Sequence, residues 1–219
     1  MIPKVSPSVL SADFGNLNKE IQLINKSSAY SIHVDVMDGV FVPNISFGQP
    51  IVKALSLISN KPLDVHLMIV DPIKFIDEFV FDNTLNITIH YESTNKIEET
   101  LNYIKSKNIK SGLAIKPNTE INEIESYIQK VDILCLMSVN PGFSGQNFIE
   151  NTYTKLKQLR KLIKKKKLST LIQIDGGVNN TNAKKLFKLG ADILVSGNYI
   201  FKSANPNKVI EYLNNLSRN

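Results

Sequence analysis

The sequence has one cysteine, Cys135, so no disulfide bond can form within the chain. Such sparse cysteine is typical of proteins from a reducing compartment. Long apolar runs are also missing, because no segment approaches the ~20 residues that a membrane-spanning helix needs. The first residues, MIPKVSPSVL, lack the charged region and the apolar stretch of a secretory signal. We therefore expect a cytoplasmic protein with no membrane partner.

Linkers are absent too. No Gly-, Ser- or Pro-rich stretch and no change of composition divides the 219 residues. A chain of this length buries roughly 70–75% of the surface that its unfolded form exposes, so it can build a core without covalent staples. Because α/β barrels of about 200 residues or more fold as single units, we expect one domain over residues 1–219.

Acidic residues are fewer than basic ones, and the formal net charge is +6. The largest basic cluster comprises Arg160, Lys161 and the run 164–167. Leucine and isoleucine recur through this segment at helical spacing, which indicates that most of these cations form the exposed face of an amphipathic helix. No aromatic residue lies within the run to stack on bases. We therefore expect no nucleic-acid partner.

Apolar segments typical of strands alternate with segments of helical periodicity along the whole chain. The predicted strands are 4–10, 31–37, 63–68, 87–92, 111–116, 133–139, 171–175 and 193–197. Helical periodicity is found between them at 17–24, 73–81, 97–105, 121–128 and 183–189. Strict alternation predicts a parallel sheet, and eight repeats favour a closed barrel over an open sheet. The sequence therefore predicts an α/β fold, the (β/α)₈ TIM barrel.

In such barrels the active site lies at the carboxyl ends of the strands. The second predicted strand, SIHVDVM, places His33, Asp35 and Met37 on one face and β-branched residues on the other. The third strand repeats this pattern with His66 and Met68. All three histidines, and three of the four methionines, lie in predicted strands, and all but His33 lie in the distal half of the strand. Polar groups thus gather where a barrel would bind its ligand.

Two imidazoles and two carboxylates from different strands would face one axis, namely His33, Asp35, His66 and Asp175. Burying two carboxylates without a compensating charge costs free energy, and a divalent cation would offset that cost. This donor set suits zinc or iron(II). Spacing alone leaves the alternative that each residue is an ordinary core or capping group. His90, on the fourth predicted strand, is interpreted as a core residue with a hydrogen-bonded ring.

Three glycine-containing segments follow the last three strands: NPGFSGQNF, DGGV and SGNYIF. Glycine lets backbone N–H groups approach an anion closely, and phosphate in these barrels binds after strands 7 and 8. Each segment alone is a weak signal, but together they predict a phosphate site. The first segment, residues 140–148, could also form a mobile lid.

At these residues the chain resembles the ribulose-phosphate 3-epimerase family. The shared stretches are PSVLSADF, HVDVMDGVFVPN, DVHLM, MSVNPGFSGQ, IDGGV and GADILVSG, which run from the first strand to the last. The resemblance implies a TIM barrel that interconverts D-ribulose 5-phosphate and D-xylulose 5-phosphate in the pentose phosphate pathway. It also implies one divalent metal per subunit, with zinc expected before iron(II), manganese or cobalt, and a homo-oligomer.

The same resemblance assigns roles to individual positions. Asp35 and Asp175 match the family's acid/base pair, and both join His33 and His66 as metal ligands. The substrate-binding positions are Ser8, Met37, His66, Met68, Met137, Gly142, Phe143, Ser144, Gly145, Gly176, Gly177, Gly197 and Asn198. Two positions depart from the family pattern, which has glycine in place of Ser144 and serine in place of Asn198. The backbone N–H groups at both positions can still donate hydrogen bonds, and the side-chain amide of an asparagine can also donate one.

Inverting a carbon beside a ketone requires removal of its proton from one face and return of a proton to the other. Two carboxylates on opposite sides of a planar enediolate can do this, one as base and one as acid. The sequence does not define the number of carbon atoms in the sugar, so a hexulose-phosphate 3-epimerase acting on allulose 6-phosphate is an alternative. An orotidine-phosphate decarboxylase would carry a lysine among these acids, and none is present. A non-catalytic phosphosugar-binding barrel should have lost at least one of Asp35, His66 or Asp175.

Overall fold

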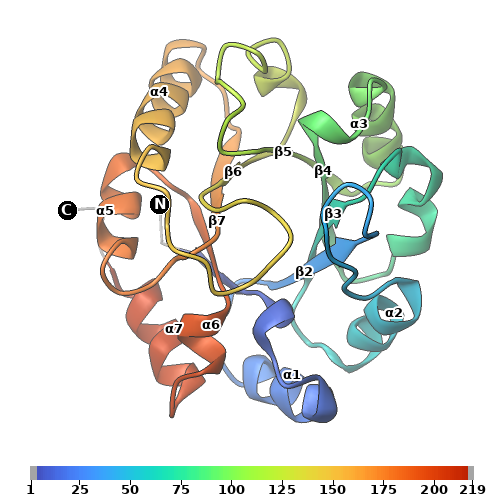
Figure 1. Cartoon of the computed structure of the whole chain (residues 1–219), viewed down its shortest axis with the longest axis vertical. Helices are drawn as coiled ribbons and strands as arrows, with labels where there is room; N and C mark the ends of the chain where they lie inside the picture. Colours follow the sequence, from blue (N-terminus) through green and yellow to red (C-terminus); the bar gives the residue numbers. More distant parts are fainter. Residues whose placement is uncertain (1–3, 217–219) are drawn as a thin grey trace.

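Eight parallel strands form one sheet in the order β1-β8-β7-β6-β5-β4-β3-β2 in the computed structural model, which describes residues 4–216 (Figure 1). Their bounds are β1 Lys4–Pro7, β2 Ile32–Met37, β3 Leu63–Met68, β4 Thr84–His90, β5 Lys110–Ile115, β6 Ile133–Met137, β7 Leu171–Asp175 and β8 Ile193–Ser196. Neighbouring strands are paired in register along this order. The predicted α/β barrel and its eight strands are confirmed, with half of the strand boundaries displaced by one to three residues.

The seam between β1 and β2 closes the barrel. Its ladder consists of one isolated parallel bridge, between Ser8 and His33. Below that bridge the hydroxyl groups of Ser6 and Ser31 lie 2.6 Å apart, and the backbone N–H of Tyr30 donates to the carbonyl of Val5 at 2.9 Å. The strand barrel is therefore closed, and its seam bridge lies beside a predicted metal ligand.

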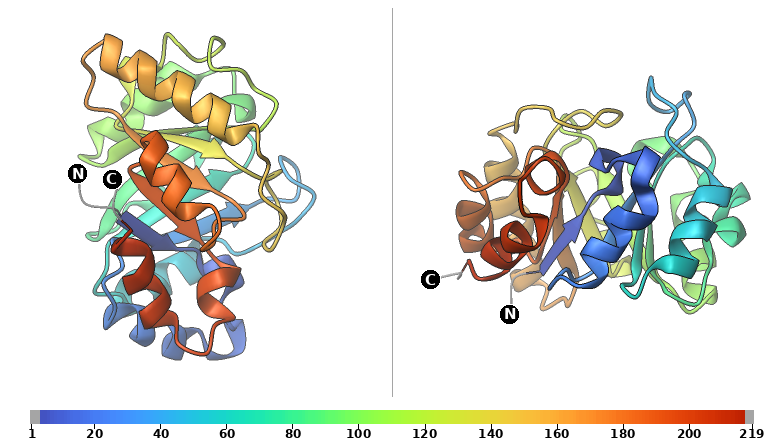
Figure 2. Two further views of the ribbon diagram at one scale, coloured as in Figure 1. Left: turned by 90° about the vertical axis from the view of Figure 1, so that its left-hand side faces the viewer. Right: turned by 90° about the horizontal axis from the view of Figure 1, so that it is seen from below.

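Helices cover the outside of the barrel (Figures 1 and 2). They are α1 Leu17–Asn25, α2 Gln49–Ile58, α3 Ile97–Ser106, α4 Thr152–Lys165, α5 Ala183–Leu189, α6 Asn198–Phe201 and α7 Pro206–Asn214. The β-branched residues of β2, Ile32, Val34 and Val36, join the main core cluster together with apolar side chains of these helices. Alternate residues of each strand thus face the helices, as the period-two pattern predicts.

Two expected helices are wrong. The segment 73–81 forms two short 3₁₀ helices, Pro72–Lys74 and Ile76–Phe79. The segment 121–128 forms successive turns in which the N–H groups of Glu123, Ile124, Glu125 and Tyr127 bond to the carbonyl three residues earlier. Ile121, Ile124 and Ile128 are nevertheless buried, so the apolar spacing is satisfied by these tighter turns. β-Branched residues and asparagine have low helix propensity, which leaves tertiary packing to decide the backbone. The helices α2, α6 and α7 had no residue range assigned from the sequence.

The basic helix α4 turns its apolar side chains to the barrel, as its periodicity predicts. Two of its basic side chains make hydrogen bonds within the protein. Arg160 donates to the carbonyl of Gly190 and pairs with Asp192, and Lys155 is buried with its ammonium group on backbone carbonyls. Among residues 4–216, no helix has the length and apolar character needed to cross a bilayer.

Loops from β2 and β6 project from the same end of the barrel, where the strand arrows point (Figure 2). In Figure 1 the loop after β6, drawn in yellow, crosses the mouth of the barrel. The carboxyl ends of the strands therefore open into a partly covered space.

Candidate active site

A cavity of about 270 Å³ lies at the carboxyl ends of the strands. Most of the predicted site residues line it: Ser8, Asp35, Met37, Met68, Met137, Gly142, Phe143, Ser144, Gly145, Asp175, Gly176, Gly177, Gly197 and Asn198. His33 and His66 are fully buried and do not line the cavity. The structure thus brings the strand-end residues together, with the two imidazoles enclosed among them.

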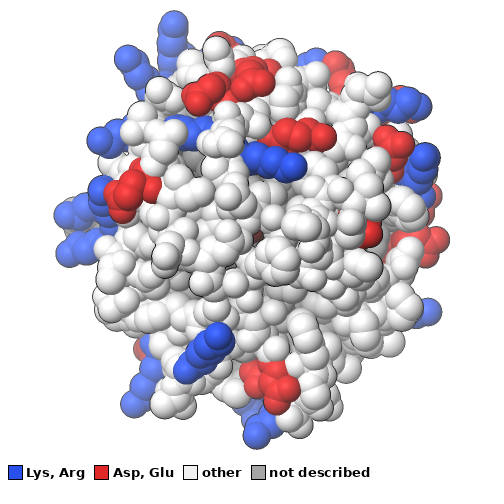
Figure 3. Space-filling view, in the orientation of Figure 1, with Lys and Arg blue, Asp and Glu red and all other residues white. Residues whose placement is uncertain are grey.

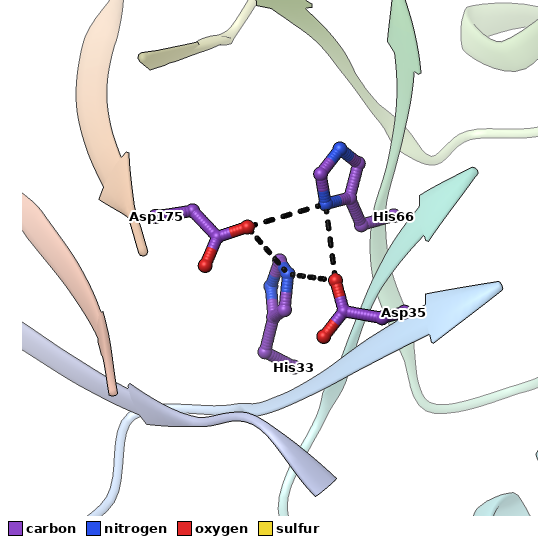
Figure 4. Close-up of side chains that lie close together, drawn as sticks. All are labelled: His33, Asp35, His66 and Asp175. Atoms are coloured by element: carbon purple, nitrogen blue, oxygen red, sulfur yellow. Dashed lines mark hydrogen bonds and ion pairs between the residues drawn. The ribbon is translucent and has the colours of Figure 1, made fainter. Parts of the chain in front are cut away.

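Four of these side chains converge on one point, as Figure 4 shows. His33 Nε2 lies 3.2 Å from Asp35 Oδ1 and 3.7 Å from Asp175 Oδ2. His66 Nδ1 lies 3.3 Å and 3.5 Å from the same two oxygens. Nitrogen and oxygen atoms therefore alternate around a ring, and all four lie within 4.8 Å of one another.

The cluster fits a divalent metal ion. His66 Nδ1 is buried and makes no hydrogen bond of acceptable geometry within residues 4–216, although two carboxylate oxygens face it. Ligands that each lie about 2.1 Å from one ion are roughly 3–3.5 Å apart, close to the separations found here. Two imidazole nitrogens and two carboxylate oxygens are a donor set that first-row divalent metals accept. The buried cluster can bind such an ion.

The electrostatics of the cluster favour ionised carboxylates. Burial raises the pKa of Asp35, but the charge of His33 and the close ring nitrogens of His33 and His66 outweigh burial, so the pKa falls below its usual range. The pKa of Asp175 is lowered in the same sense, because its close contacts with the ring nitrogens of His33 and His66 outweigh its burial. The second oxygen of Asp35 accepts a hydrogen bond from the hydroxyl of Ser8 at 2.6 Å. Both acids are thus anions on opposite sides of the cluster.

A third buried carboxylate, Asp64, orients His33. Its Oδ2 lies 2.8 Å from His33 Nδ1, and the amide groups of Gln173 and Asn86 also donate to Asp64. His33 therefore turns Nε2 toward Asp35 and Asp175. Sequence reasoning missed Asp64, yet it precedes His66 by two residues in β3 and so shares the inward face by the same alternation.

The other imidazole, His66, rests on His90. Their Nε2 atoms are 2.9 Å apart, and the rings are stacked with centroids 4.9 Å apart. His90 Nδ1 in turn lies 3.2 Å from a carboxylate oxygen of Glu92. Burial lowers the pKa of His90 to about 4, so the ring is neutral at pH 7. His90 is the buried, hydrogen-bonded residue that was predicted, but it also contacts a candidate ligand.

Three methionines, Met37, Met68 and Met137, form an apolar wall of the cavity. Met37 and Met68 pack with Val42, and Met137 packs in a second small cluster with Val139. These side chains offer no strong hydrogen-bonding group that could compete for a polar ligand. Among residues 4–216, the charged groups that line the cavity are therefore the carboxylates of Asp35 and Asp175.

The three glycine segments also contribute to the lining of the cavity. Gly145 has φ +77°, and a Cβ built there would lie 2.2 Å from the side-chain nitrogen of Asn198. The hydroxyl of Ser11 is buried without a hydrogen-bond partner among the described residues and packs against Gly197. Ser11 was missed in the sequence, although it lies in the shared stretch PSVLSADF. Its free hydroxyl and the close backbone suit an anionic oxygen.

Within residues 4–216, no lysine or arginine lines the cavity. Figure 3 shows the same face with cations and acids mostly around the edge and a largely uncharged centre. An anion in the glycine-rich end would therefore be held by N–H, hydroxyl and amide donors, as in other backbone anion sites.

The loop 140–148 lies over the cavity and is tied to the loop after β2. The side-chain amide of Asn44 donates to the carbonyl of Gly142 at 2.8 Å, and Val42 lies against Gly142. Within the loop, the amide of Gln146 donates to the carbonyls of Asn140 and Phe143. The segment is thus an ordered cover with its own internal hydrogen bonds.

Solved structures of other barrels share this architecture at low sequence identity. A tryptophan synthase α-subunit from Pyrococcus furiosus gives a TM-score of 0.69 at 15% identity, covering 98% of this chain and 96% of its own. Thiamine phosphate pyrophosphorylase from the same organism gives 0.65 at 15% identity, covering 97% and 94%. These likenesses concern the fold alone.

Sequence relatives are much closer. Ribulose-phosphate 3-epimerase from Bacillus subtilis is 40% identical over 208 residues, covering 94% of this chain and 96% of its own. The Helicobacter pylori J99 enzyme is 42% identical with 97% of each chain covered, and the chloroplastic Arabidopsis thaliana enzyme is 43% identical, covering 90% and 71%. The model of the ribulose-phosphate 3 epimerase family matches residues 4–201. The chain therefore belongs to the ribulose-phosphate 3-epimerase family.

Proposed function

We propose that this chain is an epimerase that interconverts D-ribulose 5-phosphate and D-xylulose 5-phosphate at C3 in the pentose phosphate pathway. The observation that carries the proposal is the pair of carboxylates, Asp35 and Asp175, on opposite sides of the buried cluster at the base of the cavity. Relatives that are about 40% identical over nearly the whole chain carry this activity in their names.

In the proposed reaction one carboxylate removes the C3 proton and the other returns a proton to the opposite face. Asp35 is held by the hydroxyl of Ser8, which fixes its orientation, while Asp175 approaches from β7. The acid and base exchange roles when the direction of reaction reverses. Ser8 lines the cavity and is placed to contact the substrate as well.

His33, Asp35, His66 and Asp175 are the proposed ligands of one divalent metal, with zinc as the first candidate and iron(II), manganese and cobalt as alternatives. When bound, such an ion supplies Lewis-acid stabilisation of negative charge on the substrate oxygens. The methionine wall excludes water, which strengthens electrostatic interactions within the cavity. Elemental analysis of the purified protein, before and after chelation, identifies the metal.

The phosphate group is proposed to bind at the glycine-rich end. Its donors are the backbone of Gly142–Gly145, Gly176, Gly177, Gly197 and Asn198, with Phe143 and Ser144 in the cover. The amide of Asn198 replaces the serine that the family usually has, and both groups can donate a hydrogen bond. A homo-oligomer and a cytoplasmic location stay predictions.

The deciding experiment replaces each carboxylate by its amide. Asp35→Asn and Asp175→Asn should each lower the rate of xylulose 5-phosphate formation by about 10²–10⁴-fold, because each removes a proton-transfer group. Asp175→Asn should still bind the phosphate ester, whose site lies at the glycine segments. Asp77→Asn, at an exposed position, is the control. A near-normal rate in either active-site variant would overturn the two-carboxylate mechanism.

The allulose 6-phosphate alternative is settled by competition between the two sugars. We expect kcat/KM to favour the pentulose phosphate. A higher kcat/KM for the hexulose phosphate would reassign the substrate while leaving the mechanism intact.

A further inference from the structure

The two imidazoles of the cluster present different nitrogens to it. His33 faces Asp35 and Asp175 with Nε2, whereas His66 faces them with Nδ1. A nitrogen that binds a metal must be free of its proton, so each neutral ring carries its proton on the other nitrogen. The proton of His33 then lies on Nδ1, beside the carboxylate of Asp64. The proton of His66 lies on Nε2, beside a second imidazole.

That arrangement fixes the direction of every hydrogen bond behind His66. His66 Nε2–H can only donate, so His90 Nε2 must accept and must carry no proton. The proton of the neutral His90 ring is therefore on Nδ1, where it donates to Glu92 Oε2 at 3.2 Å. The relay is defined here as His66, His90 and Glu92.

The far end of the relay is itself anchored. The other oxygen of Glu92 accepts hydrogen bonds from the backbone N–H of Lys116, at 2.8 Å, and from the hydroxyl of Thr119. All of these partners are donors, so Glu92 functions as an acceptor at both oxygens. On its other side the ring of His90 packs against Phe41, with centroids 4.8 Å apart. His90 therefore has little freedom to rotate or to exchange its tautomer.

We propose that His90 and Glu92 are positioning residues of the metal centre: they hold His66 in its Nε2–H form and so keep Nδ1 available as a ligand. This inference rests on the proposed metal function. Partners that bond the far nitrogen of a ligating histidine typically change metal affinity 10- to 100-fold when removed. The centre is asymmetric, because a carboxylate contacts His33 directly while a neutral ring separates Glu92 from His66.

Tautomers can be read directly, since the chain has three histidines. Long-range ¹H–¹⁵N NMR of ¹⁵N-histidine protein should show His90 protonated on Nδ1 and bare on Nε2, both without metal and with zinc. Assignment follows from the signals that disappear in His90→Gln. Finding the proton of His90 on Nε2 overturns the relay. This measurement succeeds or fails whether or not zinc binds, so it is separate from the test of the metal site.

Metal affinity provides the second readout. In His90→Leu, which removes the acceptor, zinc affinity measured by competition with a chromophoric chelator should fall 10- to 100-fold. His90→Gln, whose side-chain oxygen can still accept from His66, should recover most of that loss, and Glu92→Gln should weaken binding less than His90→Leu. The visible spectrum of the cobalt-loaded protein should shift in His90→Leu and return toward the original in His90→Gln.

Thr170→Val is the matched control. Its hydroxyl is buried and donates to the carbonyls of Ile128 and Val131, outside the cluster, so this variant loses a buried hydrogen bond without touching the relay. Zinc affinity should be unchanged in it. Equal affinities in His90→Leu and the original protein overturn the positioning role. If the original protein binds none of zinc, iron(II), manganese and cobalt, the proposed metal function is overturned.

Discussion

The side-chain amide of Asn44 donates to the backbone carbonyl of Gly142 at 2.8 Å, joining two loops that are 98 residues apart in the sequence. One loop follows β2, which carries Asp35, and the other covers the cavity. The hydrogen bond therefore links the position of the cover to the strand that supplies a proposed acid/base carboxylate.

Replacing Asn44 by alanine should loosen the cover. A net loss of about 1 kcal/mol for one hydrogen bond corresponds to roughly a fivefold decrease in kcat/KM. The looser cover should also let the enediolate lose inorganic phosphate, which a phosphate assay run beside the epimerase assay detects. Asn214→Ala removes a comparable hydrogen bond at α7 and should change neither quantity. Unchanged turnover and phosphate release in Asn44→Ala would exclude a closing role for this bond.

Gly145→Ala should lower kcat/KM about tenfold or more. A φ of +77° costs a non-glycine residue about 1–2 kcal/mol, and the added methyl group would contact Asn198. Adding Asn198→Ser shortens that side chain and relieves the contact with the new methyl group. The double variant should therefore regain the part of kcat/KM lost to that contact but not the part lost to backbone strain. Gly48→Ala is the control, because no atom lies within 4 Å of the position that its methyl group would occupy. Normal activity in Gly145→Ala would contradict the assigned geometry.

Lys155→Met should destabilise the fold by about 1–3 kcal/mol, because it leaves buried carbonyl groups without a donor. The ammonium group of Lys155 donates to the carbonyls of Lys116, Pro117 and Thr119. Lys157→Met, exposed on the same helix, controls for the loss of charge. Urea unfolding curves give both values. Equal stability of the two variants would show that Lys155 contributes nothing through these contacts.

Glu92 should contribute a pH-dependent part of the stability. Burial opposes its ionisation, but hydrogen bonds from His90, Thr119 and the Lys116 backbone lower its pKa from 4.5 to about 2. The unfolded chain therefore takes up a proton first as pH falls. The stabilisation is complete above pH 4.5 and is lost between pH 4.5 and 2. The difference in unfolding free energy between the original protein and Glu92→Gln, measured from about pH 7 down to about pH 3, should shrink in the acidic part. A constant difference would contradict the lowered pKa.

The inward side chains could be predicted from the sequence because strand alternation is a local rule. Once SIHVDVM and LDVHLM are strands of one barrel, His33, Asp35 and His66 must face the axis. Asp64 follows from the same rule but was overlooked, because its position at the start of the strand placed it away from the expected active-site end.

The remaining features depend on contacts that no local pattern encodes. The turns at 121–128 bury the same isoleucines that a helix would bury, so periodicity could not distinguish the two backbones. The orphaned hydroxyl of Ser11 and the Asn44–Gly142 bond depend on how separate loops meet. His90 was predicted as a hydrogen-bonded core residue, and only its distance to His66 shows what it contacts.

The bridge between Ser8 and His33 places the seam of the barrel beside the buried cluster of His33, Asp35, His66 and Asp175. Strands joined by few backbone hydrogen bonds are the first to separate in local opening of a native protein. Ser8 also donates to Asp35, so a ligand that immobilises Asp35 holds both sides of the seam. When a ligand occupies the site, the amide hydrogens of β1 and β2 should therefore exchange more slowly with deuterium, including those of residues that do not contact the ligand.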